Sequence, residues 1–210
     1  MITPRACGLL LCAIAAAAAP GCALFSKGDQ GAARYFSLGQ RASARPARVP
    51  ADAPGAGAEK ARLRLGHVTG APYLEERLLF RGPGNEIVYY RELRWVEPPE
   101  EFLKLLLARV LFEERGLEQV VGGAGPTLDV ELTALDEIRA TQHVARAQAV
   151  ARLHDDHSVL WEETLTAEIP IADRADGDLA TAAVEALGKA VRAVADTIAD
   201  RVVQRIEVRP

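Results

Sequence analysis

The chain has 210 residues, of which 49% are hydrophobic and 26% are charged, with a formal net charge of −4 at pH 7. This composition is typical of a soluble globular protein, and the length suits one domain better than two. A nucleic-acid-binding protein is not expected, because there is no basic excess and the charges alternate in sign. The aromatic content of 5% also argues against a groove that stacks sugars or bases.

Residues 1–21 have the layout of a secretory signal peptide, with Arg5 near the start, an apolar stretch over 8–14 and an alanine run. The apolar stretch is too short and too rich in alanine for a transmembrane helix, which needs about 20 strongly apolar residues. The sequence from Ala19 to Cys22 resembles a lipobox, in which a small residue precedes the cysteine that is acylated. We therefore expect residues 1–21 to be a lipoprotein signal peptide and Cys22 to carry the lipid.

The cysteine positions favour this interpretation. Cys7 and Cys12 leave with the signal peptide, so Cys22 is the only thiol that remains and no intramolecular disulfide can form. The alternative is an ordinary signal peptide that is cut near Ala19. Ala23 follows the lipidated cysteine, and by resemblance to enterobacterial sorting rules the absence of aspartate there favours the outer over the inner membrane, with the domain facing the periplasm.

The segment after the anchor alternates between irregular sequence and candidate strands. Residues 22–34 are small and polar and are expected to form a tether, and 35–38 is a short strand candidate. Residues 41–60 are rich in Ala, Pro, Gly and Arg, and we expect a flexible loop because they offer little apolar surface to offset the ordering entropy. An alternating strand starts at Arg62, and Gly66 marks a bulge in it.

The middle of the chain predicts a hairpin and then a helix. Residues 78–81 and 87–90 flank a loop that contains two glycines and a proline, which is a hairpin pattern. Pro99 can occupy the first turn of a helix, and the two glutamates that follow it favour the positive N-terminal end. Apolar residues recur at helical spacing from there until Gly116, a plausible stop.

The last third predicts an antiparallel meander followed by a long helix. Residues 127–133, 145–153 and 159–169 alternate with a period of two, and alanines occupy one face of the second segment. Asp178 caps a helix from about 179 to 206, which either forms a coiled coil or, as we expect, lies across its own sheet. The predicted fold is a single α+β domain over 35–210, an antiparallel sheet of about five to six strands with two helices packed on one face.

Residues with catalytic or metal-binding chemistry are few. His154-Asp155-Asp156-His157 offers four metal ligands, but four adjacent side chains do not converge on one ion, and a turn of the meander is the expected structure. The serines lack a Gly-x-Ser-x-Gly context, so a hydrolase nucleophile is unsupported. We therefore expect no catalytic residues, no metal and no cofactor.

Four aromatic residues are the candidates for a binding surface. Tyr73, Tyr89, Tyr90 and Trp95 could form an exposed patch that binds a partner, since Tyr and Trp are enriched at the centres of interfaces. For Trp95 and Tyr90 core packing is an equally good interpretation.

Several stretches of the chain, in their order and spacing, resemble a known family, the ABC-type transport auxiliary lipoproteins, the group that includes PqiC. The resemblance runs from the lipobox to the C-terminal helix. The stretches are Tyr35-Phe36-Ser37-Leu38, Leu63-Arg64-Leu65 leading to Pro72-Tyr73-Leu74, and Val88-Tyr89-Tyr90 followed by Trp95 and Pro98-Pro99.

The resemblance implies a protein that binds partners and has no catalytic residues. The implied partners are an MCE-domain protein and an ABC transporter, with a role in moving lipids or other hydrophobic molecules between the two membranes. A homo-oligomeric ring that docks onto the MCE component is a further expectation by analogy. Two alternatives remain: a lipoprotein that regulates peptidoglycan synthesis or another envelope complex, and a lipoprotein hydrolase.

Overall fold

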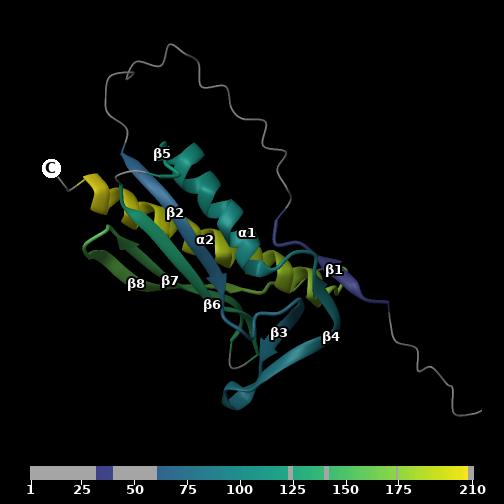
Figure 1. The fold of residues 1–210 in the computed structure, drawn as a ribbon. Coiled ribbons are helices and arrows are strands. Elements are labelled where there is room, and N and C mark those ends of the chain that lie inside the picture. The colour runs from purple at the N-terminus through teal and green to yellow at the C-terminus, as the bar shows by residue number, and fades with distance from the viewer. Residues whose placement is uncertain (1–31, 40–60, 123–124, 140–141, 174, 208–210) are drawn as a thin grey trace, which may run out of the picture. The chain divides into compact units, whose positions relative to one another are not determined.

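The computed structural model describes residues 32–39, 61–122, 125–139, 142–173 and 175–207 of the chain (Figure 1). The predicted signal peptide, the lipidation site Cys22, nearly all of the tether and the 41–60 loop lie outside these residues. Among the described residues, no helix is both long enough and apolar enough to cross a membrane.

Eight strands form the sheet in the described part of the chain, where about five to six were predicted. One strand has only two residues, which is too short for a hydrophobic period to be recognised, whereas another, of three residues, overlaps the strand candidate at 35–38. The strands are β1 (Arg34–Phe36), β2 (Arg62–Gly70), β3 (Arg77–Arg81), β4 (Ile87–Trp95), β5 (Glu118–Gln119), β6 (Thr127–Arg139), β7 (His143–His154) and β8 (Val159–Pro170).

The sheet is mixed, so the prediction of a purely antiparallel sheet is wrong. The meander β6–β7–β8 and the hairpin β3–β4 are antiparallel, as predicted. However, β2 and β3 both run parallel to β6, and β1 runs parallel to β4. Parallel neighbours require long connections, and here the hairpin and a helix separate β2 from β6 along the chain. Residue alternation reports which face of a strand is buried but not the direction of its neighbours.

The predicted bulge at Gly66 is present, since the pairing of β2 with β6 shifts register between Leu65 and Val68. The carboxylate of Asp129 fills the space beside the bulge and accepts a hydrogen bond from the His67 backbone N–H at 2.7 Å. A Cβ atom on Gly66 would lie 2.2 Å from Asp129 Oδ1. Glycine is therefore required here for space.

Both predicted helices are present. Helix α1 (Pro99–Ala108) carries two glutamates in its first turn and continues into a π-helical turn, η3 (Arg109–Glu114). The chain leaves it at Gly116, whose φ of 73° is the left-handed conformation expected at a helix stop. Helix α2 (Leu179–Glu207) starts at Asp178, which accepts a hydrogen bond from the Thr181 backbone N–H at 3.2 Å and so caps the helix.

The core lies between the helices and the long strands. Helix α2 lies on β6, β7 and β8 rather than forming a coiled coil, and α1 lies on β2 and β6 (Figure 1). Neither helix makes more than marginal contact with β3 or β4, so the predicted packing of both helices on one face holds for the long strands only. Small residues allow α2 to approach β7 closely, and those with no exposure are Ala145, Ala147, Ala149 and Ala151 on the strand and Ala190, Ala195 and Ala199 on the helix.

Candidate functional site

The aromatic residues that the sequence proposes for partner binding lie together around the base of the β3–β4 hairpin. Trp95 is only 6% exposed and belongs to the core. Tyr73 and Tyr89 are half-buried, and the Tyr89 hydroxyl donates to the Tyr73 carbonyl at 2.8 Å. The Tyr73 hydroxyl in turn donates to the Thr133 carbonyl at 2.5 Å. Both hydroxyls are thus used within the fold, which leaves the ring faces and edges for contact with a partner.

Two arginines of β3 cover these tyrosine rings. The guanidinium carbon of Arg77 lies 4.7 Å from the centre of the Tyr89 ring, and that of Arg81 lies 5.7 Å from the centre of the Tyr73 ring. Cation–π contacts of this length are attractive and fix the ring orientation. Arg77, whose side chain is 41% exposed, therefore presents a guanidinium group on the Tyr89 ring, whereas Arg81 lies largely buried between Tyr73 and Asp136.

A surface hollow of about 520 Å³ opens beside Arg77 and is called the hairpin hollow below. Its wall consists of residues 74–77 at the start of β3, Arg94 at the end of β4, and Pro98 and Glu100 at the start of α1. Within the described ranges, Oε2 of Glu100 is buried and has no hydrogen-bond partner. The hollow thus combines basic and acidic side chains from three elements.

Two carboxylates are buried next to one another on β6. Asp136 has no exposed surface. Its carboxylate accepts hydrogen bonds from Nε and Nη2 of Arg146, each at 3.1 Å, and from Nε of Arg81. Arg81 comes from β3 and Arg146 from β7, so one carboxylate ties three strands together. A bidentate arginine–carboxylate pair is among the stronger polar contacts in proteins.

Glu137, which is 2% exposed, holds a second polar cluster. It accepts hydrogen bonds from Arg139 Nε at 2.7 Å and from the Tyr90 hydroxyl, and it lies 2.5 Å from His143 Nε2. Burial by itself raises the pKa of Glu137, but the hydrogen bonds from Arg139, Tyr90 and His143 outweigh it and hold the pKa below its usual value. Burial and the bond to Glu137 raise the pKa of Tyr90, so the hydroxyl stays protonated and donates.

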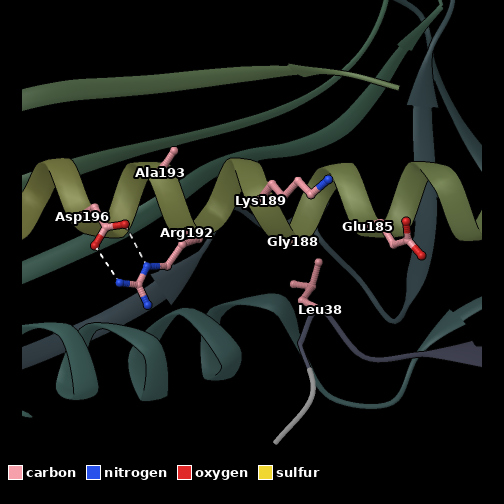
Figure 2. Close-up of a pocket in the computed structure, with 7 residues that line it drawn as sticks. All are labelled: Leu38, Glu185, Gly188, Lys189, Arg192, Ala193 and Asp196. Atoms are coloured by element: carbon pink, nitrogen blue, oxygen red, sulfur yellow. Dashed lines mark hydrogen bonds and ion pairs between the residues drawn. The ribbon is translucent and has the colours of Figure 1, made fainter. Parts of the chain in front are cut away.

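A second hollow of about 530 Å³ lies along α2 (Figure 2). Leu38 approaches the helix so closely that a Cβ atom on Gly188 would lie 2.4 Å from the Leu38 carbonyl oxygen. On the other side of this segment, a Cβ atom on Gly39 would lie 2.9 Å from the Phe102 ring of α1. The segment therefore contacts both helices and makes up one wall of the hollow.

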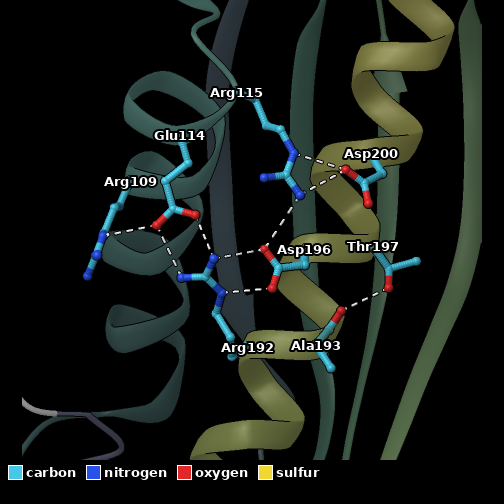
Figure 3. Close-up of polar contacts among 8 residues, drawn as sticks. All are labelled: Arg109, Glu114, Arg115, Arg192, Ala193, Asp196, Thr197 and Asp200. Carbon is cyan, nitrogen blue, oxygen red and sulfur yellow. Dashed lines mark hydrogen bonds and ion pairs between the residues drawn. The ribbon is translucent and has the colours of Figure 1, made fainter. Parts of the chain in front are cut away.

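Ion pairs join η3 and α2 next to this second hollow (Figure 3). Arg192 donates to Glu114, at 2.5 and 3.2 Å, and to Asp196 of its own helix, at 2.8 and 3.0 Å. Hydrogen bonds from Arg192 lower the pKa of Glu114, and those to Asp196 and Glu114 raise the pKa of Arg192. These ion pairs hold η3 and α2 together. The positive charge of Arg192 is balanced by two carboxylates within the fold.

The histidines around the β7–β8 connection have structural roles. The predicted turn is present, and Asp155 Oδ1 accepts the backbone N–H groups of His157 and Ser158 at 2.9 and 2.8 Å. His154 instead points to Asp129, with Nε2 and Oδ2 3.0 Å apart. In the portion of the chain that the structure describes, no three His, Cys, Asp or Glu side chains are grouped to hold a metal ion.

Sequence reasoning missed the buried acids and the hairpin hollow. Asp136 and Glu137 lie beyond the alternating stretch 127–133, and acidic residues are seldom buried, so nothing in their residue type marks them as part of the interior. A weak signal was available, because the β6 strand continues through them to Arg139 and the opposite strand offers Arg146. Arg77 and Arg94 become neighbours only when the register of the β3–β4 hairpin is known.

The fold is similar to solved structures of low sequence identity. A protein from Xanthomonas campestris matches with a TM-score of 0.61 and 15% identity over 70% of this chain and 86% of that one. An uncharacterised protein matches with a TM-score of 0.58 and 15% identity over 82% and 99%. A hypothetical protein from Chlamydia trachomatis matches with a TM-score of 0.50 and 11% identity over 70% and 98%. At these identities the likeness concerns the fold alone.

Sequence comparison identifies the family. Among curated proteins, none matches the chain. The profile of the family described as the ABC-type transport auxiliary lipoprotein component matches residues 45–199, which is most of the chain and includes seven of the eight described strands, all of α1 and α2 up to residue 199. This agrees with the resemblance seen in the sequence, and the chain therefore belongs to the ABC-type transport auxiliary lipoprotein family.

Proposed function

We propose that this lipoprotein is anchored through Cys22 in the outer membrane and binds the periplasmic MCE-type component of an ABC transport system, which it supports in moving lipids or other hydrophobic molecules between the membranes. The observation that carries the proposal is the family match over residues 45–199. Inner-membrane anchoring is the less favoured location, and a ring of several copies is the proposed assembly.

The described surface favours binding over catalysis. The buried carboxylates on β6 are neutralised by arginines and lie inside the fold, where they hold strands together. His154 is paired with Asp129, and the neighbouring aspartate is used in a turn. In contrast, the base of the β3–β4 hairpin carries two half-buried tyrosines and the exposed guanidinium group of Arg77, and tyrosine and arginine are enriched where proteins bind partners. We assign partner contact to Tyr73 and Tyr89, with Trp95 supporting them from the core.

Partner capture tests the proposal directly. The full-length protein with a C-terminal tag is purified in mild detergent, and co-purifying proteins are identified by mass spectrometry. We expect an MCE-domain protein, and we expect Tyr89→Ala to reduce its recovery by about tenfold, as for a residue at the centre of an interface. Leu105→Ala is the matched control, because Leu105 is 62% exposed on α1, away from the hairpin. Recovery of a peptidoglycan synthase in place of an MCE protein would reject the transport assignment.

Lipidation is tested separately with an alkyne-labelled fatty acid. Wild-type protein and Cys12→Ala are expected to incorporate the label, and Cys22→Ala is expected to lose it, because one acylated thiol accounts for the anchor. Labelling of Cys22→Ala at the wild-type level would show that the anchor lies elsewhere. The anchor is firm if the labelled protein also sediments with outer-membrane vesicles.

A further inference from the structure

Two arginines from neighbouring strands line the hairpin hollow. Arg77 on β3 and Arg94 on β4 are register partners in the antiparallel hairpin, a placement that is destabilising for like charges. Among the described residues, Arg94 donates only to the backbone carbonyls of Tyr90 and Leu93, at 3.4 and 3.2 Å. Arg77 lies on the Tyr89 ring and reaches Glu75 only at 4.0 Å. Both arginines therefore line one hollow, and the only carboxylate paired with either of them among the described residues is Glu75 at 4.0 Å, which leaves their hydrogen-bonding capacity largely available to an anion.

Another part of the wall carries a carboxylate that lacks a hydrogen-bond donor. The Glu100 carboxylate lies over Gly70, where a Cβ atom would come within 2.8 Å of Oε2. This oxygen is buried and has no hydrogen-bond donor in the described part of the chain, although Glu100 as a residue lines the hollow, so its negative charge has no bonded counter-charge within the fold. Glu75 and Glu76 line the same hollow, so a cationic N–H group is the suitable donor.

The charges together define the class of molecule. An anion alone would be repelled by three glutamates, and a cation alone by two arginines, whereas a molecule that carries both signs meets a partner for each. Guanidinium pairs match the geometry of phosphate, and a primary ammonium has three donors for carboxylates. The volume of about 520 Å³ lies within the range of small-molecule sites.

Two exposed side chains, one aromatic and one apolar, neighbour Arg94 in the sheet and along the chain. Tyr35 on β1 is the register partner of Arg94 and is 66% exposed, and Val96, two residues beyond Arg94, is 61% exposed. An exposed tyrosine beside basic groups is typical of proteins that contact the headgroup level of a membrane. Tyr35 follows Cys22 by 13 residues, a stretch that spans up to about 43 Å when extended, so a hollow at this end of the sheet is within reach of the anchoring bilayer.

From these observations we infer that the hairpin hollow binds a zwitterionic phosphate–amine headgroup, with Arg77 and Arg94 on the phosphate and Glu100 on the ammonium. A phospholipid at the membrane is the source, and Tyr35 and Val96 contact its acyl side. Only this assignment of the source rests on the proposed function, because the charge pattern that selects the headgroup is independent of lipidation and of the MCE partner.

The test titrates the full-length protein, in mild detergent, with O-phosphoethanolamine, inorganic phosphate and ethanolamine by calorimetry. We expect O-phosphoethanolamine to bind at least about tenfold more tightly than either part alone, since two charge-assisted contacts add. Arg94→Gln is expected to abolish this binding, Arg94→Lys to weaken it, and Arg91→Gln, an exposed arginine of the same strand, to leave it unchanged. Glu100→Gln is expected to remove the preference over phosphate.

Absence of heat with O-phosphoethanolamine, or equal losses in Arg94→Gln and Arg91→Gln, would overturn the inference, provided that thermal unfolding shows each variant folded. Short-chain phosphatidylethanolamine then tests the source. It should bind more tightly than O-phosphoethanolamine, and Tyr35→Ala should reduce only the lipid affinity. Equal affinity for both molecules would reject the lipid source. Partner capture with Arg94→Gln tests the two proposals separately. If this variant still recovers the MCE protein, a failure of headgroup binding does not affect the proposed function.

Discussion

Beneath α2 the sheet buries alanine and leucine, whereas at the β3–β4 end the same sheet buries two carboxylates among three arginines and a histidine. The first region is held by close packing against a 29-residue helix. The second has little contact with either helix and is held by polar contacts between β3, β4, β6 and β7. The two ends of β6 therefore depend on different interactions.

The difference bears on function. Apolar packing is non-directional and does not fix the orientation of polar groups, whereas hydrogen bonds fix the geometry of the groups that make them. The hairpin carries the tyrosines and arginines proposed for binding, and a binding surface works best on groups that are already in place. We expect the buried acids to position the hairpin surface, while the α2 region supplies most of the stability.

The largest effect is expected from Asp136→Ala. Removing this carboxylate leaves Arg81 and Arg146, with side chains 14% and 23% exposed, without their acceptor. Breaking such a pair costs about 3–5 kcal/mol of unfolding free energy. Denaturant unfolding measures the loss, and Glu131→Ala on the same strand, an exposed position, should change it by less than about 0.5 kcal/mol. Equal losses in the two variants would mean that Asp136 has no special role.

Glu137→Gln is expected to cost less and to depend on pH. The substitution keeps the shape but replaces a charged acceptor by a neutral one, for a loss of about 1–3 kcal/mol at neutral pH. The folded protein holds the pKa of Glu137 below its usual value, so this stabilisation is complete above pH 5 and is lost as the pH falls through the folded pKa. Unfolding free energies of both proteins from pH 3 to 8 should therefore converge at the acidic end. A difference that stays constant over this range would contradict the proposed ionised state.

Much of the α2 region could be predicted from the sequence. The alternation in 127–133 and 145–153, the cap at Asp178 and the stop at Gly116 are local signals, and each corresponds to an observed contact. Strand direction could not be predicted, because alternation is the same for parallel and antiparallel neighbours. Strand β5 has only two residues and no recognisable period of its own, whereas β1 overlaps the strand candidate at 35–38.

The hairpin end was harder to predict, because its chemistry depends on pairs that are distant in the sequence. Tyr73 and Tyr89 were identified from residue type, but their hydroxyl partners and the covering arginines were not. Asp136 reaches Arg81, which is 55 residues away, and a strongly polar residue carries no mark that it will be buried. Residue type therefore identified the tyrosines of this region but not the charged residues around them or the contacts between them.

The smallest effect is expected in the packed region, from Gly188→Ala. Alanine in place of glycine normally stabilises a helix by about 1 kcal/mol. Here its Cβ would lie 2.4 Å from the Leu38 carbonyl oxygen, and overpacking of this kind costs about 1–3 kcal/mol. The segment cannot easily withdraw, because Gly39 already lies against Phe102 and Ser37 Oγ donates to Glu97 at 3.0 Å. The net result is a loss of about 1 kcal/mol, opposite in sign to the propensity rule.

Denaturant unfolding shows whether Gly188→Ala raises or lowers the unfolding free energy. Lys189→Ala is the control at the next position, where the helix propensity hardly changes. A stabilised Gly188→Ala would show that the Leu38 segment moves away at little cost, and the packed region would then be the more adaptable end of the sheet. A loss that does not change between pH 3 and 8 would instead complete the contrast with Glu137. It would mean that the α2 region depends on shape, which pH does not alter, and the hairpin end on charge, which pH does.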